Sequence, residues 1–333
     1  MTGRIRVLHS LAPPDGTTKY VDQMTDGAPD DVEVTYFSWK RALRGDYDVL
    51  HLHWPELLLR ARSRPKRFAK RQAMRATLFL ARRRGTPIVR TVHNLQPHES
   101  GGRAERRILA AVDRQTALFI RLNPTTDLPT RYSAVTILHG HYRDRFADHR
   151  RSLRESGRIL YFGIIRPYKN VEKLIEVYTA EARPGTHLRI VGSPSPELRG
   201  RIERAAASHP DVTTRLAFVE DSELVSEITA ATLVVLPYAE MHNSGAALVA
   251  LSLDRPILVP RTPSNEALAT EVGAPWVQLY DGDLDGEVLD GALAAAEVLG
   301  ADERPRLEGR DWDEVGRRHR DVYRSVLSRG GDE

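Results

Sequence analysis

Strand-like and helical segments alternate along almost the whole chain, and this alternation constrains the fold more than any other feature of the sequence. In the first half, apolar strand patterns are separated by helical patterns at about 19–24, through a basic stretch, and at 103–116. The strand patterns lie at 5–9, 32–37, 49–54, 87–92, 117–120 and 135–138. Such an order predicts an α/β fold with a mostly parallel sheet, whose ligands bind beyond the carboxyl ends of the strands.

The second half of the chain starts the same alternation again. Its predicted strands are 158–162, 188–192, 214–218, 232–237 and 256–260, and its predicted helices are 171–181, 196–207, 221–229, 245–253 and about 312–328. A charge-dense segment at 144–157 separates the halves, and 333 residues with 41% hydrophobic content are enough for two cores. We therefore predict one domain over residues 1–147, a second over 157–308, and a C-terminal segment over 309–333.

The composition excludes several kinds of protein. The chain has no cysteine, which rules out disulfides, thiolate metal ligands and a cysteine nucleophile. Its first residues run directly into a strand pattern, and no apolar run approaches the length of a membrane span. The net charge of +4 says little by itself, and the sequence predicts a cytoplasmic protein.

The basic residues are concentrated in one stretch. Between Glu56 and Glu99 there is no acidic residue, and the cations there are Arg60, Arg62, Arg64, Lys66, Arg67, Lys70, Arg71, Arg75, Arg82, Arg83, Arg84 and Arg90. The apolar residues Phe68, Met74, Leu78, Phe79 and Leu80 are interleaved with them. We predict an amphipathic helix over Arg60–Arg84 that binds an anionic membrane, so that the protein is peripheral on the inner face of the cell membrane. A solvated helix without a partner is the alternative; nucleic acid is not expected, because no nucleic-acid-binding motif accompanies the patch.

Two loops of the second half have the composition of phosphate sites. The first follows strand 158–162 and carries Gly163, Arg166 and Lys169 before a helix, so backbone N–H groups and two cations can act on one diphosphate. An ordinary strand-to-helix turn with solvated cations is the alternative.

The second loop runs from Pro237 to Gly245. Asn243 or Ser244 is placed to cap the following helix, Gly245 allows close approach to its backbone, and Glu240 can accept hydrogen bonds from sugar hydroxyls. A capped helix with no ligand is the alternative.

The order of these motifs resembles that of GT-B glycosyltransferases, in particular a bacterial subgroup associated with cell-surface polysaccharide assembly. The similar segments are Phe162-Gly163 with Arg166 and Lys169, Val191-Gly192-Ser193, Pro237 to Gly245 followed by Arg255-Pro256-Ile257, Val49 to His53, and Thr91-Val92-His93-Asn94. The resemblance implies two Rossmann-like domains that face each other across a cleft, with a C-terminal helix that crosses back to the first domain. It also implies a donor site for a UDP- or GDP-linked sugar in the second domain, at Gly163, Arg166, Lys169, Gly192, Ser193, Tyr238, Glu240, Asn243, Ser244 and Gly245.

One position departs from the family pattern. Many retaining members carry a second glutamate eight residues after the first, and this chain has Leu248 at that spacing from Glu240. Whether the enzyme retains or inverts the anomeric configuration is therefore left open.

The chemistry requires few protein groups. Arg166 and Lys169 would stabilise the departing diphosphate. An inverting reaction also needs a base, for which His93 is the first candidate and His51, His53, His98 and Asp15 are reserves. In a retaining reaction the leaving phosphate takes the proton and His93 contacts the sugar; a core or capping histidine is the third possibility.

The acceptor side of the cleft is predicted at the strand ends of the first half. Its residues are Gly16, Thr17, His51, His53, Asn94, His139 and His141. The pairs His51-x-His53 and His139-x-His141 can each offer two metal ligands, but no cysteine or carboxylate pair completes a site, so no essential metal is predicted.

We predict a glycosyltransferase that moves a hexose from a nucleotide-diphosphate sugar to a glycan or lipid-linked glycan without a metal or any permanently bound cofactor. The alternatives are a sugar-nucleotide epimerase or a phosphorylase on the same fold, or a relative that binds nucleotides or nucleic acid without catalysis.

Overall fold

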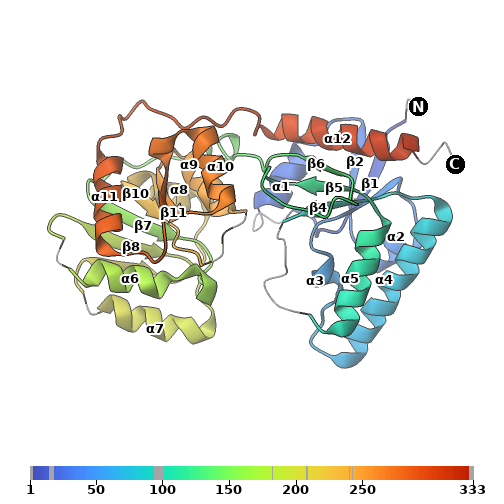
Figure 1. Cartoon of the computed structure of the whole chain (residues 1–333), viewed down its shortest axis with the longest axis horizontal. Coiled ribbons are helices and arrows are strands. Elements are labelled where there is room, and N and C mark those ends of the chain that lie inside the picture. The colour runs from blue at the N-terminus through green and yellow to red at the C-terminus, as the bar shows by residue number, and fades with distance from the viewer. Residues whose placement is uncertain are drawn as a thin grey trace. The chain divides into compact units, whose positions relative to one another are not determined.

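The computed structural model describes residues 3–14, 19–93, 101–181, 183–207, 209–239, 241 and 243–329. The chain divides into two compact units, one formed by Met1–Gly140 with Gly309–Glu333 and the other by His141–Glu308. Each unit contains a six-stranded parallel sheet, and the predicted α/β class is confirmed (Figure 1).

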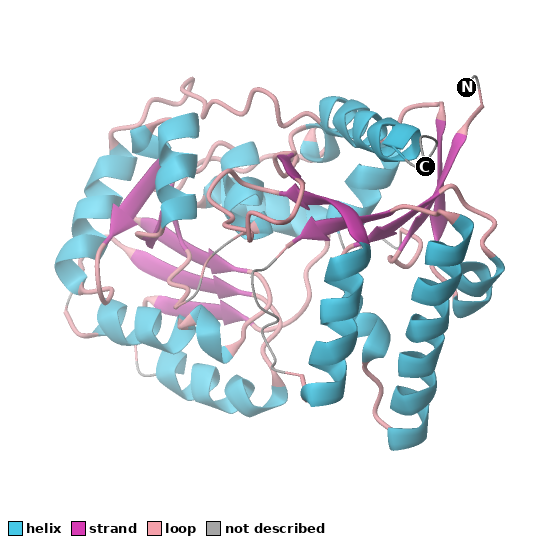
Figure 2. Ribbon diagram, turned by 45° about the vertical axis from the view of Figure 1, so that its right-hand side comes forward, coloured by secondary structure: helices cyan, strands magenta, loops and turns pink. Residues whose placement is uncertain are grey.

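The sheet of the first unit has the strand order β2-β1-β3-β4-β5-β6. Its strands are β1 (Ile5–His9), β2 (Val32–Tyr36), β3 (Val49–Leu52), β4 (Ile88–Val92), β5 (Thr116–Arg121) and β6 (Ala134–Thr136). Helices cover both faces of this sheet (Figure 2). All residues of the inner strand β3 are buried, because a parallel strand between two helical layers meets no solvent on either face.

The helices of the first unit form two groups. The first group is α2 (Trp39–Arg44), α3 (Pro55–Leu59), α4 (Arg64–Arg84) and α5 (Arg103–Gln115), and the second is α1 (Lys19–Asp26) with α12 (Trp312–Arg329). In the first group, Met74, Leu78 and Ile108 pack with Leu50 and Leu52 of the sheet in one core.

The C-terminal helix α12 packs on the first unit, as predicted. It contacts α1 and β5, and its buried residues Val315, His319, Val322 and Val326 recur at helical spacing. Gly316 lies so close to the backbone of Gly27 that a side-chain carbon there would overlap the Gly27 carbonyl.

The helix predicted over residues 60–84 begins four residues later than predicted. Residues 60–63 are not helical and separate α3, which ends at Leu59, from α4, which runs from Arg64 to Arg84. Pro65 explains the break, because a proline fits the first turn of a helix and not its interior. No helix in the described ranges combines the length and the apolar composition that a membrane span requires.

The sheet of the second unit has the order β12-β11-β10-β7-β8-β9. Its strands are β7 (Arg158–Phe162), β8 (His187–Val191), β9 (Val212–Arg215), β10 (Leu233–Val235), β11 (Ile257–Pro260) and β12 (Val277–Tyr280), and its helices are α6 (Val171–Thr179), α7 (Pro196–Ala207), α8 (Asp221–Ala230), α9 (Gly245–Ser252), α10 (Pro263–Val272) and α11 (Gly286–Glu297). Helix α9 is apolar on every side and is buried from Ala247 to Ser252, as such a composition requires.

The second unit begins at His141, before the predicted boundary at residue 147. The amide of Tyr142 donates to Ser252 Oγ at 2.8 Å, and Arg143 donates to the carbonyl of Pro305 at 2.8 Å. These bonds tie the segment after Gly140 to the second unit.

Candidate functional site

The carboxyl ends of β7 and β8 are joined backbone to backbone. Gly163 and Gly192 follow these strands with φ of 113° and 151°, conformations that side chains rarely adopt. A side-chain carbon on Gly192 would overlap the carbonyl of Gly163, and the Ile165 amide donates to the Ser193 carbonyl at 2.9 Å. The loops that carry Arg166 and Ser193 are therefore held as one rim.

The loop after β10 meets this rim through Lys169. The Ala239 amide donates to the Tyr168 carbonyl at 2.8 Å, and the Lys169 ammonium lies 3.7 Å from the ring centroid of the buried Tyr238. Burial, and secondly the charge of Arg166, lower the pKa of Lys169 to about 8. Arg166 is exposed at the same rim.

Helix α9 begins where the second predicted phosphate loop ends. Ser244 is its N-cap, accepting a hydrogen bond from the Ala247 amide at 3.2 Å, and Asn243 precedes it. A side-chain carbon on Gly245 would meet only the Tyr142 hydroxyl, at 3.9 Å, so the backbone here is open to close approach. Glu240, the predicted carboxylate of this loop, lies outside the described residues, as do Gly16, Thr17, Asn94 and the reserve bases Asp15 and His98.

Histidines gather at the carboxyl ends of three neighbouring strands in the first unit. His9 ends β1, His51 lies in β3 with His53 just after it, and His93 follows β4. His9 and His51 are register partners across the sheet, and their rings lie 4.7 Å apart between centroids. The structure therefore brings together the predicted residues His51, His53 and His93.

These histidines are neutral. Burial is the main cause that lowers the pKa of His9 to about 3, and it lowers those of His51, His53 and His93 well below the usual value for an imidazole. Neighbouring histidines add to the effect for all four groups, because each would repel a second positive charge.

Aromatic rings fix the orientation of His93. Trp54 stacks on its imidazole with ring centroids 3.8 Å apart, and Tyr20 meets it edge-on at 5.0 Å. Sequence reasoning did not single out Tyr20, Trp54 or His9. His9 had a recognisable signal, because it stands at or near a strand end, as His51 and His93 do.

The predicted pair His139 and His141 is divided between the units. His139 belongs to the first unit, where its ring lies 5.1 Å from that of Tyr20 and Arg310 donates to its carbonyl at 2.7 Å. His141 belongs to the second, where Nδ1 accepts from the Arg143 amide at 3.3 Å. Among described residues, His9, His51 and His53 have ring nitrogens within 4.8 Å of one another; that no essential metal is bound stays a prediction.

The fold is that of several solved glycosyltransferases. HepE from Anabaena, crystallised with UDP and glucose, superposes with a TM-score of 0.65 at 11% identity over 96% of this chain and 100% of its own. The trehalose 6-phosphate synthase of Burkholderia multivorans gives 0.64 at 12% identity over 99% and 98%, and AviGT4, a glycosyltransferase of avilamycin A biosynthesis, gives 0.55 at 14% over 97% and 98%. The chain thus has the GT-B fold, as the resemblance predicted.

Its family is given by sequence. The chain is 45% identical to a GDP-mannose:glycolipid 4-beta-D-mannosyltransferase of Xanthomonas campestris pv. campestris, over 99% of its own length and 95% of the relative's. It belongs to the family of that enzyme. No family model matches the chain.

Proposed function

We propose that this protein transfers mannose from GDP-mannose to a hydroxyl of a glycolipid and inverts the anomeric configuration. The observation that carries the proposal is the meeting of the Arg166–Lys169 loop with the loop after β10, in a chain 45% identical to a mannosyltransferase named for this donor and acceptor. The second unit then holds the donor and the first unit holds the acceptor.

In the donor site, cations and helix amides together stabilise the negative charge of the leaving group. Arg166 and Lys169 bind the diphosphate, while the backbone near Gly163, Gly192 and Ser193 lets it approach closely. The N-terminus of α9 offers its first amides beside Asn243, Ser244 and Gly245. The ring of Tyr238 packs against the Lys169 ammonium. We assign Glu240 to the sugar or ribose hydroxyls.

The relative's name and the chemistry of the donor support inversion. GDP-mannose carries an α-linked sugar, so a β-mannoside forms by direct displacement at the anomeric carbon, with a base for the acceptor hydroxyl. His93 is that base in our proposal, because it is neutral and its ring is held by Trp54. Leu248, which replaces the glutamate of many retaining enzymes, agrees with this outcome.

On the acceptor side, all predicted histidines of known placement are buried, and His51 and His53 are the most deeply buried. His51 and His53 are 0% and 2% exposed in the first unit, so we propose that they support His93 instead of touching the acceptor. His139, which borders Tyr20, together with Gly16, Thr17, Asn94 and His141, remains proposed for the acceptor.

The reaction itself tests this function. Purified protein, a short glycolipid acceptor and GDP-mannose should give a β-mannoside, identified by the one-bond C1–H1 coupling in NMR, and UDP-sugars should not substitute. Arg166→Ala and Lys169→Ala should each raise the donor KM at least tenfold. Lys173→Ala is the matched control, because Lys173 is paired with Glu176 on the surface of α6. An α-linked product, or equal use of UDP-sugars, would refute the proposal.

We further propose that α4 attaches the protein to the inner face of the cell membrane. Phe68 and Phe79 are 63% and 61% exposed, and residues eleven positions apart lie about three turns apart on one face. Arg64 and Arg75 share that face with the same spacing. Other basic residues of the stretch have structural roles: Arg60 and Arg71 pair with the buried Glu105.

Vesicle flotation tests the attachment. The protein should float with vesicles that contain anionic lipid and much less with neutral ones. Phe68→Ala with Phe79→Ala should lower the bound fraction at least tenfold, since each phenylalanine gains about 1.5–3 kcal/mol on full burial. Leu153→Ala, at a 92% exposed leucine of the second unit, is the control. Equal flotation of the double variant and the control would contradict the proposal.

A further inference from the structure

A continuous chain of hydrogen bonds leads from His93 into the first unit. His93 Nε2 lies 3.2 Å from His53 Nδ1, His53 Nε2 lies 3.1 Å from His9 Nδ1, and His9 Nε2 lies 3.5 Å from the Tyr323 hydroxyl. Tyr323 then bonds His51 Nδ1 at 2.8 Å, and His51 Nε2 bonds the Thr91 hydroxyl at 2.8 Å.

His53, His9 and His51 each bond one neighbour through Nδ1 and another through Nε2. A neutral imidazole has one donor and one acceptor nitrogen, so a head-to-tail chain satisfies every member when all protons point the same way. With the Nε2–H tautomer in each histidine, the protons point from His93 towards Tyr323, and Nδ1 of His93 is a basic nitrogen.

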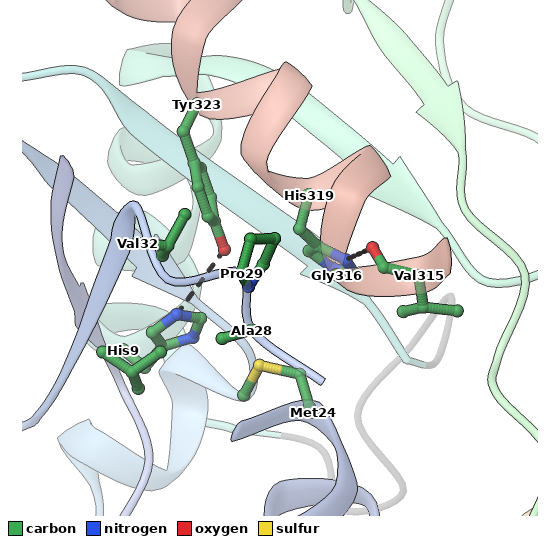
Figure 3. A pocket seen from close by; sticks show the side chains of 10 residues that line it. His9, Met24, Ala28, Pro29, Val32, Val315, Gly316, His319 and Tyr323 are labelled. Carbon is green, nitrogen blue, oxygen red and sulfur yellow. Dashed lines mark hydrogen bonds between the residues drawn. The ribbon is translucent and has the colours of Figure 1, made fainter. Parts of the chain in front are cut away.

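The far end of the chain comes from the other end of the sequence. Tyr323 lies on α12, and Figure 3 shows its hydroxyl directed towards the imidazole of His9. A cavity of about 10 Å³ lies beside them, lined by His9, Tyr323 and His319. His319 donates from Nδ1 to the Val315 carbonyl at 2.8 Å and takes no part in the chain of bonds.

We propose that His53 and His9 are positioning residues that hold His93 in its basic tautomer. The inference rests on the proposed function, in which His93 is the base. The acceptor O–H bond breaks, its electron pair stays on the attacking oxygen, and the proton binds Nδ1 of His93. The positive charge then rests on His93, and its Nε2–H still donates to Nδ1 of His53.

The same three histidines His9, His51 and His53 could be read as metal ligands, and the chain of bonds argues against this. Their nitrogens already bond one another, Tyr323 and Thr91, whereas metal-bound histidines usually donate to a carboxylate or carbonyl. A buried divalent ion would also bring two charges without a described carboxylate beside the three rings. Metal analysis of the purified protein is accordingly part of the test.

The first experiment reads the tautomers directly. In protein labelled with ¹⁵N-histidine, two-dimensional NMR at pH 7 should show His53 and His9 as neutral Nε2–H tautomers, with assignments from His53→Asn and His9→Asn spectra. Tyr323→Phe should move the His9 Nε2 resonance. An Nδ1–H tautomer at either position, or one equivalent of bound metal, would overturn the inference. This readout requires no turnover, so it stands apart from any failure of His93 as base.

The second experiment measures catalysis by variants of the chain of bonds. His53→Asn should lower kcat at least tenfold at unchanged donor KM, because His93 loses the partner that fixes its tautomer. His319→Gln, equally buried and outside the chain of bonds, is the control and should keep its kcat. If His53→Asn keeps full kcat, or the control loses as much, the positioning role is refuted. If His93→Ala keeps full kcat, the base assignment fails, and the tautomer result alone tests the chain of bonds.

Discussion

Raising the pH should weaken donor binding, because Lys169 loses its charge. Among the described donor residues, it is the one expected to titrate in this range. Its ammonium lies above the Tyr238 ring at the rim of β7 and β10, and burial has brought its pKa down to about 8. The charged form binds the diphosphate, and a bound diphosphate in turn raises the pKa of Lys169. Affinity for GDP is therefore complete below pH 8 and is lost as the pH rises through 8.

The size of the effect follows from the titration. A group with a pKa of about 8 is about 90% charged at pH 7 and about 9% charged at pH 9. The Kd of GDP should therefore rise about tenfold between these pH values, or about 1.4 kcal/mol. Arg166 is the second cause of the lowered pKa, so Arg166→Ala should move the inflection to higher pH while weakening binding at every pH.

Titration calorimetry with GDP between pH 6.5 and 9 measures this dependence. Lys169→Arg is the matched variant, because arginine keeps its charge over the whole range. The ligand's own ionisations act equally on both proteins and cancel in the ratio of their Kd values. A ratio that stays constant from pH 7 to pH 9 would refute the placement of Lys169 against the diphosphate.

Three further results are expected. Gly192→Ala should destabilise the second unit by about 3 kcal/mol or more in denaturant unfolding, because its new carbon overlaps the Gly163 carbonyl, whereas Gly200→Ala in α7 should stabilise it by up to about 1 kcal/mol; equal midpoints would contradict the close strand ends. Gly316→Ala should loosen α12 from α1, measured as faster hydrogen exchange in both helices, and unchanged exchange would refute their packing. Glu105→Gln should cost about 1–3 kcal/mol of stability, because Arg60 and Arg71 lose their partner, and a loss no greater than that of Glu176→Gln would show the pair to be unimportant.

Most of the fold could be predicted from the sequence, because the strong patterns lie within single helices and strands. Helices α5, α7 and α8 lie within a residue of their predicted bounds, since each has buried apolar residues at helical spacing, and α7 also begins at a proline. Five helices and strands had no prediction. The short helices α2 and α3 lie in the first unit, and α10, β12 and α11 follow the last strong strand pattern at 256–260. Strand β12 has only four residues at the sheet edge and shows too short an alternation to be recognised.

The apolar residues of α4 show where a periodic pattern alone misleads. Met74, Leu78, Phe68 and Phe79 all counted towards one predicted membrane face. In the structure Met74 and Leu78 enter the core of the first unit, whereas Phe68 and Phe79 remain exposed. A helix that serves both a core and a surface carries two apolar stripes, and one sequence cannot say which residue belongs to which stripe.

The candidate sites differ in how far the sequence could reach them. The donor loops are local, and Gly163, Arg166 and Lys169 can be read from seven consecutive residues. The histidine chain depends on the parallel order β1-β3-β4, which aligns three strand ends, and on α12, which brings Tyr323 to His9 from more than three hundred residues away.

The donor and acceptor sites also use opposite electrostatics. Cations at the donor rim stabilise the negative charge that develops on phosphate. The imidazoles are kept uncharged by burial and mutual repulsion, and in our proposal His93 accepts a proton. A base must be unprotonated before the reaction, and burial keeps His93 in that state.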